Sequence, residues 1–382
     1  MESGLISRPL HGAKVNRQNR AQAFCLCVRL VLPAVGLMGL LLSPVLSFCQ
    51  NVPPLPLTIS GQISDAATGN VLPHVNVFLA NTTLGAVTDA EGRYVIRNVP
   101  VGTCELVASL LGYEIQKIAV RITTDNATLH LRLQATTLAM SAIEVLAAPD
   151  REWRKNFQRF ESLFWGNGYK ADECKILNQE VLNFEIEKES NCFIAVASRP
   201  LRLENLRLGY RAEFIVQEFR YYLNEQEIKF AFIPRFEEMP PANRDEAQRW
   251  KANRHATYLG SLRHFLASVI AGRLGPEGYE VAILPNLPWE GQEKRFNRKI
   301  TDFSEMLSPT AFPSEIEFNF IGILQILYKP ERGDHQTSWL VAKRDHVLLN
   351  KAGYAYDGYA FFLYGHWFTQ RTAEALPRDY EP

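Results

Sequence analysis

Short runs of alternating polar and apolar residues fill residues 57–133. Seven such runs, separated by turn residues, are LTISGQISD, VNVFLAN, LGAVTD, RYVIRNV, CELVASLLGY, EIQKIAVRI and ATLHLRL. Alternation with a period of two is typical of strands that bury one face, and closely spaced turns favour a small antiparallel sandwich. The pattern therefore predicts a seven-stranded all-β sandwich over residues 57–134.

Residues 150–382 combine helical and strand-like patterns. Apolar residues at spacings of three and four predict a helix that starts near Asp150 and stops at Gly166. A second apolar stripe predicts one long amphipathic helix within residues 244–274; its members are Tyr258, Leu262, Phe265, Leu266, Val269 and Ile270. Strand-like runs precede and follow this stripe, so we expect an α+β domain.

The amino-terminal segment has the layout of a secretory signal. A basic region that ends at Arg29 precedes the uncharged apolar run LVLPAVGLMGLLLSPVLSFCQ. Small residues two positions apart at the end of such a run mark a cleavage site. We therefore expect a signal peptide over residues 1–49, cleaved between Cys49 and Gln50, and a proline-rich linker over residues 50–56.

Two alternatives for this segment stay open. One is an anchor helix that is not cleaved, and the other is a lipoprotein signal with Cys49 as the acylated residue. Phe48 is bulkier than the residue that usually precedes a lipid-attachment cysteine, which favours simple cleavage. In each case the protein is expected to be exported, and to reside in the periplasm or at the outer membrane.

Charge composition argues against a nucleic-acid partner. The 382 residues contain 41 basic and 41 acidic side chains, so the formal net charge is zero. Nucleic-acid binding requires a basic surface. We expect membrane contact only through the signal segment or through a lipid on Cys49.

Two acidic residues beside a glycine, Asp89 and Glu91 before Gly92, raise the question of a calcium loop. Such a loop needs oxygen ligands at alternating positions, and the preceding alternate position is Val87. A glycine with positive φ and an aspartate at the first turn position are instead typical of a hairpin. We predict a turn here and no metal site.

The sandwich segment resembles the carboxypeptidase-like regulatory domain, a transthyretin-like fold. The matching elements are Gly61, the Asp65–Gly69 turn, Leu72-Pro73, Val75-Asn76-Val77, Gly85, Thr88-Asp89, Gly92, Pro100, Gly102 and Leu111-Gly112-Tyr113. The resemblance implies an exported protein of the Bacteroidota type. Residues 135–149 resemble the strand that links this module to receptor plugs, but the remaining chain is too short for a receptor barrel.

In metallocarboxypeptidases the regulatory module accompanies a separate zinc domain with an HxxE pair. None of the eight histidines of this chain is followed at the third position by glutamate. The resemblance therefore implies no peptidase active site, and we expect no cofactor. Residues 150–382 resemble a region that follows the module in similar envelope proteins, for which we know no established chemistry.

A polar cluster on the predicted long helix gives one candidate for catalysis. Arg254, Ser261 and His264 fall within one sector of a helical wheel, and a Ser–His pair can form a nucleophile. No GxSxG elbow surrounds Ser261, and no acidic partner is identified. We interpret the cluster as the polar flank of an amphipathic helix, with an unrecognised hydrolase as the alternative.

Aromatic residues near the carboxyl end give a candidate for binding. Tyr356, Tyr359, Tyr364 and Trp367 lie within twelve positions of one another. Exposed rings would provide a large contact area for sugar faces, but we favour the interpretation that these rings form part of a sheet core. We expect a non-enzymatic envelope protein that acts as a binding or scaffold module, with an envelope protein or a glycan as partner and carbohydrate binding as the alternative.

Overall fold

The computed structural model describes four ranges, residues 57–136, 150–166, 172–288 and 298–382. Residues 54–382 form one compact unit. The predictions for residues 1–56, including the cleavage site at Cys49 and Gln50, and for residues 137–149 lie outside the described residues.

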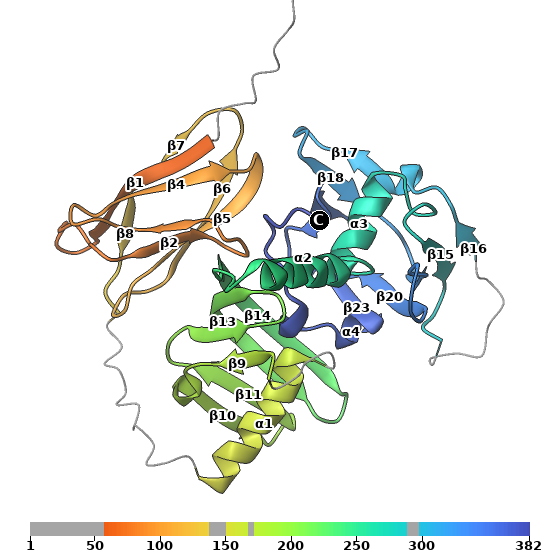
Figure 1. Cartoon of the computed structure of the whole chain (residues 1–382), viewed down its shortest axis with the longest axis horizontal. Helices are drawn as coiled ribbons and strands as arrows, with labels where there is room; N and C mark the ends of the chain where they lie inside the picture. The colour runs from red at the N-terminus through yellow and green to blue at the C-terminus, as the bar shows by residue number, and fades with distance from the viewer. Residues whose placement is uncertain (1–56, 137–149, 167–171, 289–297) are drawn as a thin grey trace, which may run out of the picture. The chain divides into compact units, whose positions relative to one another are not determined.

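Residues 57–136 form a two-layered β-sandwich (Figure 1). The strands are β1 (Leu57–Asp65), β2 (Asn76–Leu79), β3 (Gly85–Val87), β4 (Arg93–Val99), β5 (Gly102–Ser109), β6 (Gln116–Ile122), β7 (Ala127–Thr128) and β8 (Leu131–Leu133). One sheet has the order β4-β1-β7 with β8 also beside β1, and the other has the order β3-β2-β5-β6. Alternate residues such as Ile59, Ile63 and Ile96 fill the space between the two layers.

The sandwich has eight strands, so the prediction of seven was wrong. The last predicted run divides into β7 and β8, and both pair with β1 in parallel. The division occurs at Leu129, whose backbone N–H donates to the Ser60 carbonyl at 2.7 Å as the chain passes close to Gly61. The prediction of a purely antiparallel sandwich is corrected accordingly.

The segment from Asp89 to Arg93 is a turn, as predicted. The Asp89 Oδ1 accepts hydrogen bonds from the backbone N–H of Glu91 at 3.1 Å and of Arg93 at 2.8 Å. Gly92 has a φ of 70°, which suits glycine. Both carboxylates pair with the Arg93 guanidinium, at 3.1 Å for Asp89 and 2.9 Å for Glu91.

Asp65 is expected to make the sandwich sensitive to acid. Its carboxylate accepts hydrogen bonds from the Thr68 N–H at 2.7 Å, the Tyr113 hydroxyl at 3.0 Å and the Ala67 N–H at 2.9 Å. These bonds, led by the Thr68 N–H, lower the pKa of Asp65 below its ordinary value. Because the folded-state pKa is depressed, the stabilisation is present above the unfolded pKa and is lost as the pH falls through the folded pKa.

We therefore expect the melting temperature of the sandwich to fall on acidification below the ordinary aspartate pKa, and Asp65→Asn to flatten this dependence. Thermal melts followed by far-ultraviolet circular dichroism across an acid pH series would measure it. Asp125→Asn changes an exposed carboxylate in the same sandwich and serves as the control. Equal acid sensitivity in all three proteins would contradict the assignment.

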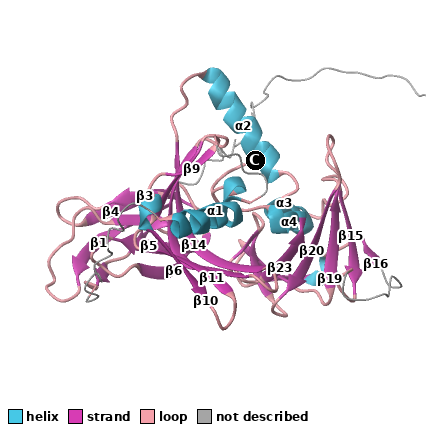
Figure 2. Ribbon diagram, turned by 90° about the horizontal axis from the view of Figure 1, so that it is seen from below, coloured by secondary structure: helices cyan, strands magenta, loops and turns pink. Residues whose placement is uncertain are grey.

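Residues 150–238 place one helix against a six-stranded sheet (Figure 2). The elements are α1 (Arg151–Trp165), β9 (Cys174–Ile176), β10 (Leu182–Glu187), β11 (Cys192–Ala197), β12 (Leu201–Asn205), β13 (Tyr210–Tyr222) and β14 (Glu227–Glu238). The predicted helix is confirmed: Asp150 caps its start by accepting from the Trp153 N–H at 2.7 Å, and Gly166 ends it. Phe160 and Phe164 are buried against the sheet.

The predicted long amphipathic helix is wrong, because the chain breaks it into α2 (Arg244–Tyr258) and α3 (Leu262–Ile270). Gly260 adopts a φ of 76°, which is incompatible with a continuous right-handed helix. Ser261 then caps α3. The apolar stripe was correctly identified only on α3, where Phe265, Leu266 and Val269 are buried.

The described strands after α3 form two antiparallel sheets. The elements are β15 (Tyr279–Leu284), β16 (Arg298–Ile300), β17 (Leu307–Pro309), β18 (Glu315–Phe318), β19 (Ile323–Tyr328), β20 (Gln336–Ala342), β21 (Val347–Asn350), β22 (Tyr354–Ala355), β23 (Phe361–Gly365) and α4 (His366–Thr369). The sheet orders are β16-β15-β19-β20-β23 and β17-β18-β21-β22. A separate hydrophobic core, which includes Phe265, Phe318 and Trp367, lies among these elements.

Candidate functional site

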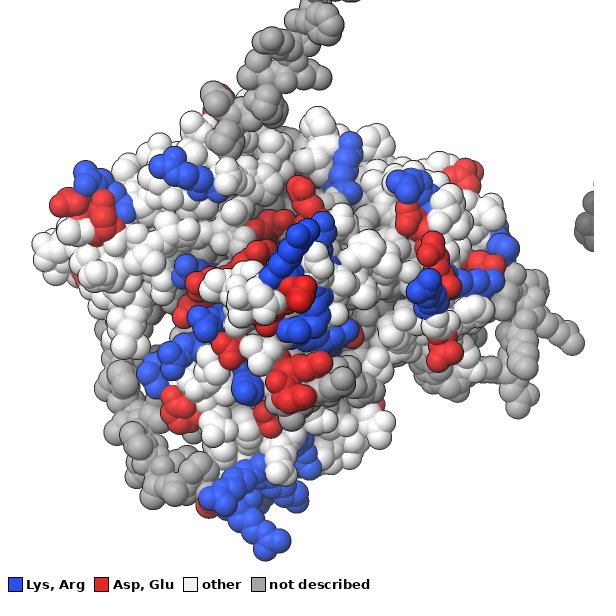
Figure 3. Space-filling model, in the orientation of Figure 1, with Lys and Arg blue, Asp and Glu red and all other residues white. Residues whose placement is uncertain are grey.

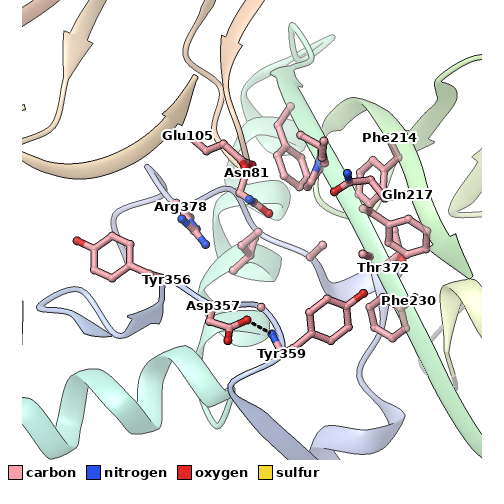
Figure 4. Close-up of a pocket in the computed structure, with 18 of the residues that line it drawn as sticks. Asn81, Glu105, Phe214, Gln217, Phe230, Tyr356, Asp357, Tyr359, Thr372 and Arg378 are labelled. Carbon is pink, nitrogen blue, oxygen red and sulfur yellow. Dashed lines mark hydrogen bonds between the residues drawn. The ribbon is translucent and has the colours of Figure 1, made fainter. Parts of the chain in front are cut away.

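A cavity of about 690 Å³ lies where the sandwich meets the carboxyl-terminal elements. Figure 4 shows side chains from three parts of the chain around it: Asn81 and Glu105 from the sandwich, Phe214, Gln217 and Phe230 from β13 and β14, and Tyr356, Asp357, Tyr359, Thr372 and Arg378 from the carboxyl-terminal segments. Its volume is within the range of roughly 300–1,000 Å³ that is usual for small-molecule sites.

Hydrogen bonds between distant parts of the chain hold these walls together. The Arg378 backbone N–H donates to the Asn81 carbonyl at 2.7 Å, and the Thr83 N–H donates to the Asp379 carboxylate at 3.0 Å. On the other side, the Arg235 guanidinium of β14 donates to the Asn76 side chain at 2.9 Å. The cavity walls are therefore built into the fold.

A small hydrophobic cluster adds to this contact. Phe78 and Val107 of the sandwich pack with Ile233 of β14, and all three are almost fully buried. Burial of apolar side chains of this size typically contributes about 1.5–3 kcal/mol each. Val107 and Ile233 lie on β5 and β14, the strands that also provide lining residues of the cavity, and Phe78 lies on the neighbouring strand β2.

Two of the four aromatic residues that the sequence indicated line this cavity, namely Tyr356 and Tyr359. The Tyr359 hydroxyl donates to the Glu218 carboxylate of β13 at 2.8 Å, and burial together with this bond raises the pKa of Tyr359 to about 12. Its ring is still 40% exposed. Phe230, which sequence reasoning missed, adds a second ring that is 38% exposed.

The other two aromatic candidates are elsewhere. Trp367 is buried in the carboxyl-terminal core, where its indole N–H donates to the Gly260 carbonyl at 2.7 Å and its ring lies 5.4 Å from that of Phe265. Tyr364 packs beside the small cluster that contains Leu284 and Ile323. Trp367 therefore belongs to the core, which is the interpretation that the sequence analysis favours for these rings.

Charged side chains of both signs reach the cavity. Three acids line it, and each has a basic partner: Glu105 with Lys117 at 3.8 Å, Asp357 with Arg344 at 3.3 Å, and Glu374 with Arg207 at 3.8 Å. Arg371 and Arg378 also line it. Over the face of the molecule drawn in Figure 3, acidic and basic side chains are interspersed, in agreement with the formal net charge of zero.

The polar cluster of the sequence analysis does not assemble as a unit. Arg254 belongs to α2, where its guanidinium donates to the Leu208 carbonyl at 2.7 Å and to the Glu238 carboxylate at 2.9 Å. Ser261 instead begins α3, and its hydroxyl oxygen accepts from the backbone N–H of His264 at 3.2 Å. The prediction that Arg254, Ser261 and His264 share one face of a single helix was therefore wrong.

The His264 imidazole is engaged by other groups. Its Nδ1 lies 2.9 Å from the Tyr279 hydroxyl and 3.1 Å from the Gly260 N–H, and its Nε2 lies 3.3 Å from the Glu277 carboxylate. Burial lowers the pKa of His264, against the opposing effect of Glu277. Both ring nitrogens are thus used in a buried network, and the Ser261 hydroxyl is used as a helix cap.

Two further structural observations concern metals and membranes. Within the described ranges, no group of three or more His, Cys, Asp or Glu side chains is placed to hold a metal ion. Of the described helices, none has both the length and the apolar character needed to span a bilayer.

Comparison with known families identifies the sandwich. Residues 59–145 match the family model of the CarboxypepD_reg-like domain, which confirms the resemblance drawn from the sequence. The regulatory domain is a non-catalytic module. No curated protein matches the chain.

Solved structures give only distant likeness. The chain is 29% identical to a type II cohesin–X-dockerin complex from Acetivibrio cellulolyticus over 20% of its own length and 52% of that chain, with a TM-score of 0.18. It is 13% identical to a putative membrane-associated protein of unknown function from Bacteroides fragilis, covering 48% of this chain and 95% of that one, with a TM-score of 0.18. For a DUF3823 family protein from Bacteroides ovatus the identity is 6%, the coverage 78% and 99%, and the TM-score 0.17. These scores carry no argument about function.

Proposed function

We propose that this chain, whose residues 59–145 match the family model of the carboxypeptidase-like regulatory domain, is a non-enzymatic exported envelope protein that binds a ligand in the cavity between the sandwich and the carboxyl-terminal elements. The single observation that supports the proposal is the 690 Å³ cavity with partly exposed aromatic rings on its wall. In this proposal the sandwich is a scaffold that provides one wall.

Carbohydrate is the ligand class that these rings favour. Sugar rings have one apolar face that packs on an aromatic ring, and their hydroxyl groups require hydrogen-bond partners at the rim. Tyr359 and Phe230 offer the rings. Gln217, Thr103 and Thr372, from three different parts of the chain, offer amide and hydroxyl groups around the same cavity. A segment of an envelope protein is the alternative ligand.

Tyr359→Ala is expected to weaken glycan binding about tenfold, or about 1.4 kcal/mol, because it removes a ring from the cavity wall. Isothermal titration calorimetry against a panel of oligosaccharides would measure the loss. Phe362→Ala removes a ring of similar exposure, 38%, from β23 outside the cavity and is the matched control. Binding of no oligosaccharide by the unsubstituted protein would refute the carbohydrate proposal.

The hydrolase alternative makes a contrasting prediction at Ser261. Since Ser261 caps α3, Ser261→Ala is expected to lower the free energy of unfolding by about 1 kcal/mol. Ser261→Asp is the matched control, because aspartate is also a good cap and should retain stability, although it cannot replace a nucleophilic hydroxyl. Urea unfolding would measure both variants. Unchanged stability in Ser261→Ala, together with loss of a hydrolytic activity in both variants, would support the hydrolase instead.

A further inference from the structure

Two arginines on the cavity wall differ from the other charged residues there. Among the residues that the structure describes, neither Arg371 nor Arg378 has a carboxylate within ion-pair distance. The three acids of the wall are already paired with lysine or with other arginines. The cavity therefore presents two cations whose charge is not balanced by a direct partner.

The donors of these guanidiniums are mostly uncommitted within the described chain. Arg371 donates only to the Gln370 carbonyl, at a long 3.4 Å, and its guanidinium carbon lies 4.4 Å from the centre of the Phe368 ring. Arg378 donates through its side chain to the Ala355 carbonyl, also at 3.4 Å. Each guanidinium carries five N–H donors in a planar fork. Most of these donors are available to a ligand.

Burial of these two guanidinium groups is unfavourable for the stability of the protein without a ligand. Partial removal from water lowers the pKa of Arg371 to about 10 and also lowers the pKa of Arg378. A desolvated cation without a counter-ion is unfavourable, and an anion that enters the cavity would offset the cost. A carboxylate matches the planar fork with two parallel hydrogen bonds.

We infer that the ligand of this cavity is a carboxylate-bearing oligosaccharide, whose acid group is bound by Arg371 and Arg378. The inference rests on the proposed function and specifies its ligand. An acidic sugar accounts for both features of the wall, since its rings pack on Tyr359 and Phe230 and its hydroxyl groups can donate to the paired carboxylates. An acidic peptide would use the arginines but has no general need of the partly exposed rings.

The test compares acids with their neutral forms. Trigalacturonate, a hyaluronan tetrasaccharide and sialyllactose are titrated into the purified protein by calorimetry, each beside its methyl ester, with tetraglutamate as the peptide probe. We expect at least one acid to bind with a Kd below about 1 mM, and at least about tenfold more tightly than its ester. Arg371→Gln and Arg378→Gln should each weaken that binding about tenfold or more.

Two further variants keep the result interpretable. Arg371→Lys retains the charge but lacks the planar fork, and it is used if Arg371→Gln does not fold. Arg249→Gln alters an exposed arginine of α2 outside the cavity and should bind as the unsubstituted protein does. Equal melting temperatures would show that any loss of binding is not a loss of folding.

Each outcome decides a different point. Equal binding of an acid and its ester, or full binding by the Arg371 and Arg378 variants, would overturn the inference and leave the carbohydrate proposal standing. Absence of binding by all six saccharides would overturn both. Binding of tetraglutamate without any saccharide would assign the two arginines to recognition of an acidic peptide.

Discussion

Replacing Phe265 with alanine is expected to lower the free energy of unfolding of the carboxyl-terminal region by about 3–5 kcal/mol. Phe265 is fully buried, and its ring lies 5.4 Å from that of Trp367 and 5.5 Å from that of Tyr279. Truncation would remove a large apolar group and leave a cavity that the surrounding sheets cannot fill without rearrangement.

Urea unfolding followed by tryptophan fluorescence would measure this effect. The six tryptophans all lie between residues 153 and 367, so their emission reports on this part of the chain and not on the sandwich. Phe362→Ala, at a position that is 38% exposed, is the control and should cost much less. A similar unfolding midpoint for both variants would show that Phe265 is not a central core residue.

Gly61→Ala is expected to destabilise the sandwich by about 3 kcal/mol, at the upper end of what an added methyl group usually costs in a packed interior. A Cβ at this position would lie 1.8 Å from the Leu129 carbonyl oxygen and 2.6 Å from its carbon. Both atoms are backbone, so relief requires the chain between β7 and β8 to move away from β1. The parallel pairing of β1 with both strands would then weaken.

Hydrogen exchange measured by mass spectrometry would locate the change. Faster exchange should appear in peptides from β1, β7 and β8, because exchange reports local opening of these pairings. Gly275→Ala is a suitable control, since no atom lies within 4 Å of the added methyl group. Unaltered exchange in the sandwich of Gly61→Ala would contradict the close approach of Leu129.

Local sequence patterns identified α1 and most strands of the sandwich, although not their exact number or pairing. Alternation in RYVIRNV places Tyr94 and Ile96 in the core, and helical spacing does the same for Phe160 and Phe164. These elements bury one continuous face, so periodicity alone identifies them. The strand β8 was not separated from β7 because their division depends on contact with Gly61, which is distant in sequence.

The break between α2 and α3 shows a limit of periodicity. The apolar stripe that starts at Tyr258 continues in phase across Gly260 and Ser261, so it predicts one helix. Glycine commonly ends a helix, and serine commonly caps the start of the next one. At Gly260 and Ser261 this local signal outweighs the apolar periodicity. Because the Gly260-Ser261 pair separates the helices, Ser261 and Arg254 do not share a helix face.

The candidate site could be predicted only in part. Aromatic density identified Tyr356 and Tyr359 but did not distinguish them from the buried Trp367, because composition does not reveal which rings face a cavity. Arg371 and Arg378 carry no local signal at all. They line the cavity together with residues of β5 and β14, which are more than a hundred residues away in sequence.

The cavity can form only after residues 377–380 have been synthesised, because these residues pack against the sandwich. Arg378 and Asp379 bond to Asn81 and Thr83, so one wall comes from near the start of the folded chain and another from near residue 380. The sandwich has its own core and can fold early in biosynthesis, whereas the cavity requires residues 377–380, which are translated later. A premature stop codon shortly before Arg378 would thus yield a chain with an intact sandwich and an incomplete cavity.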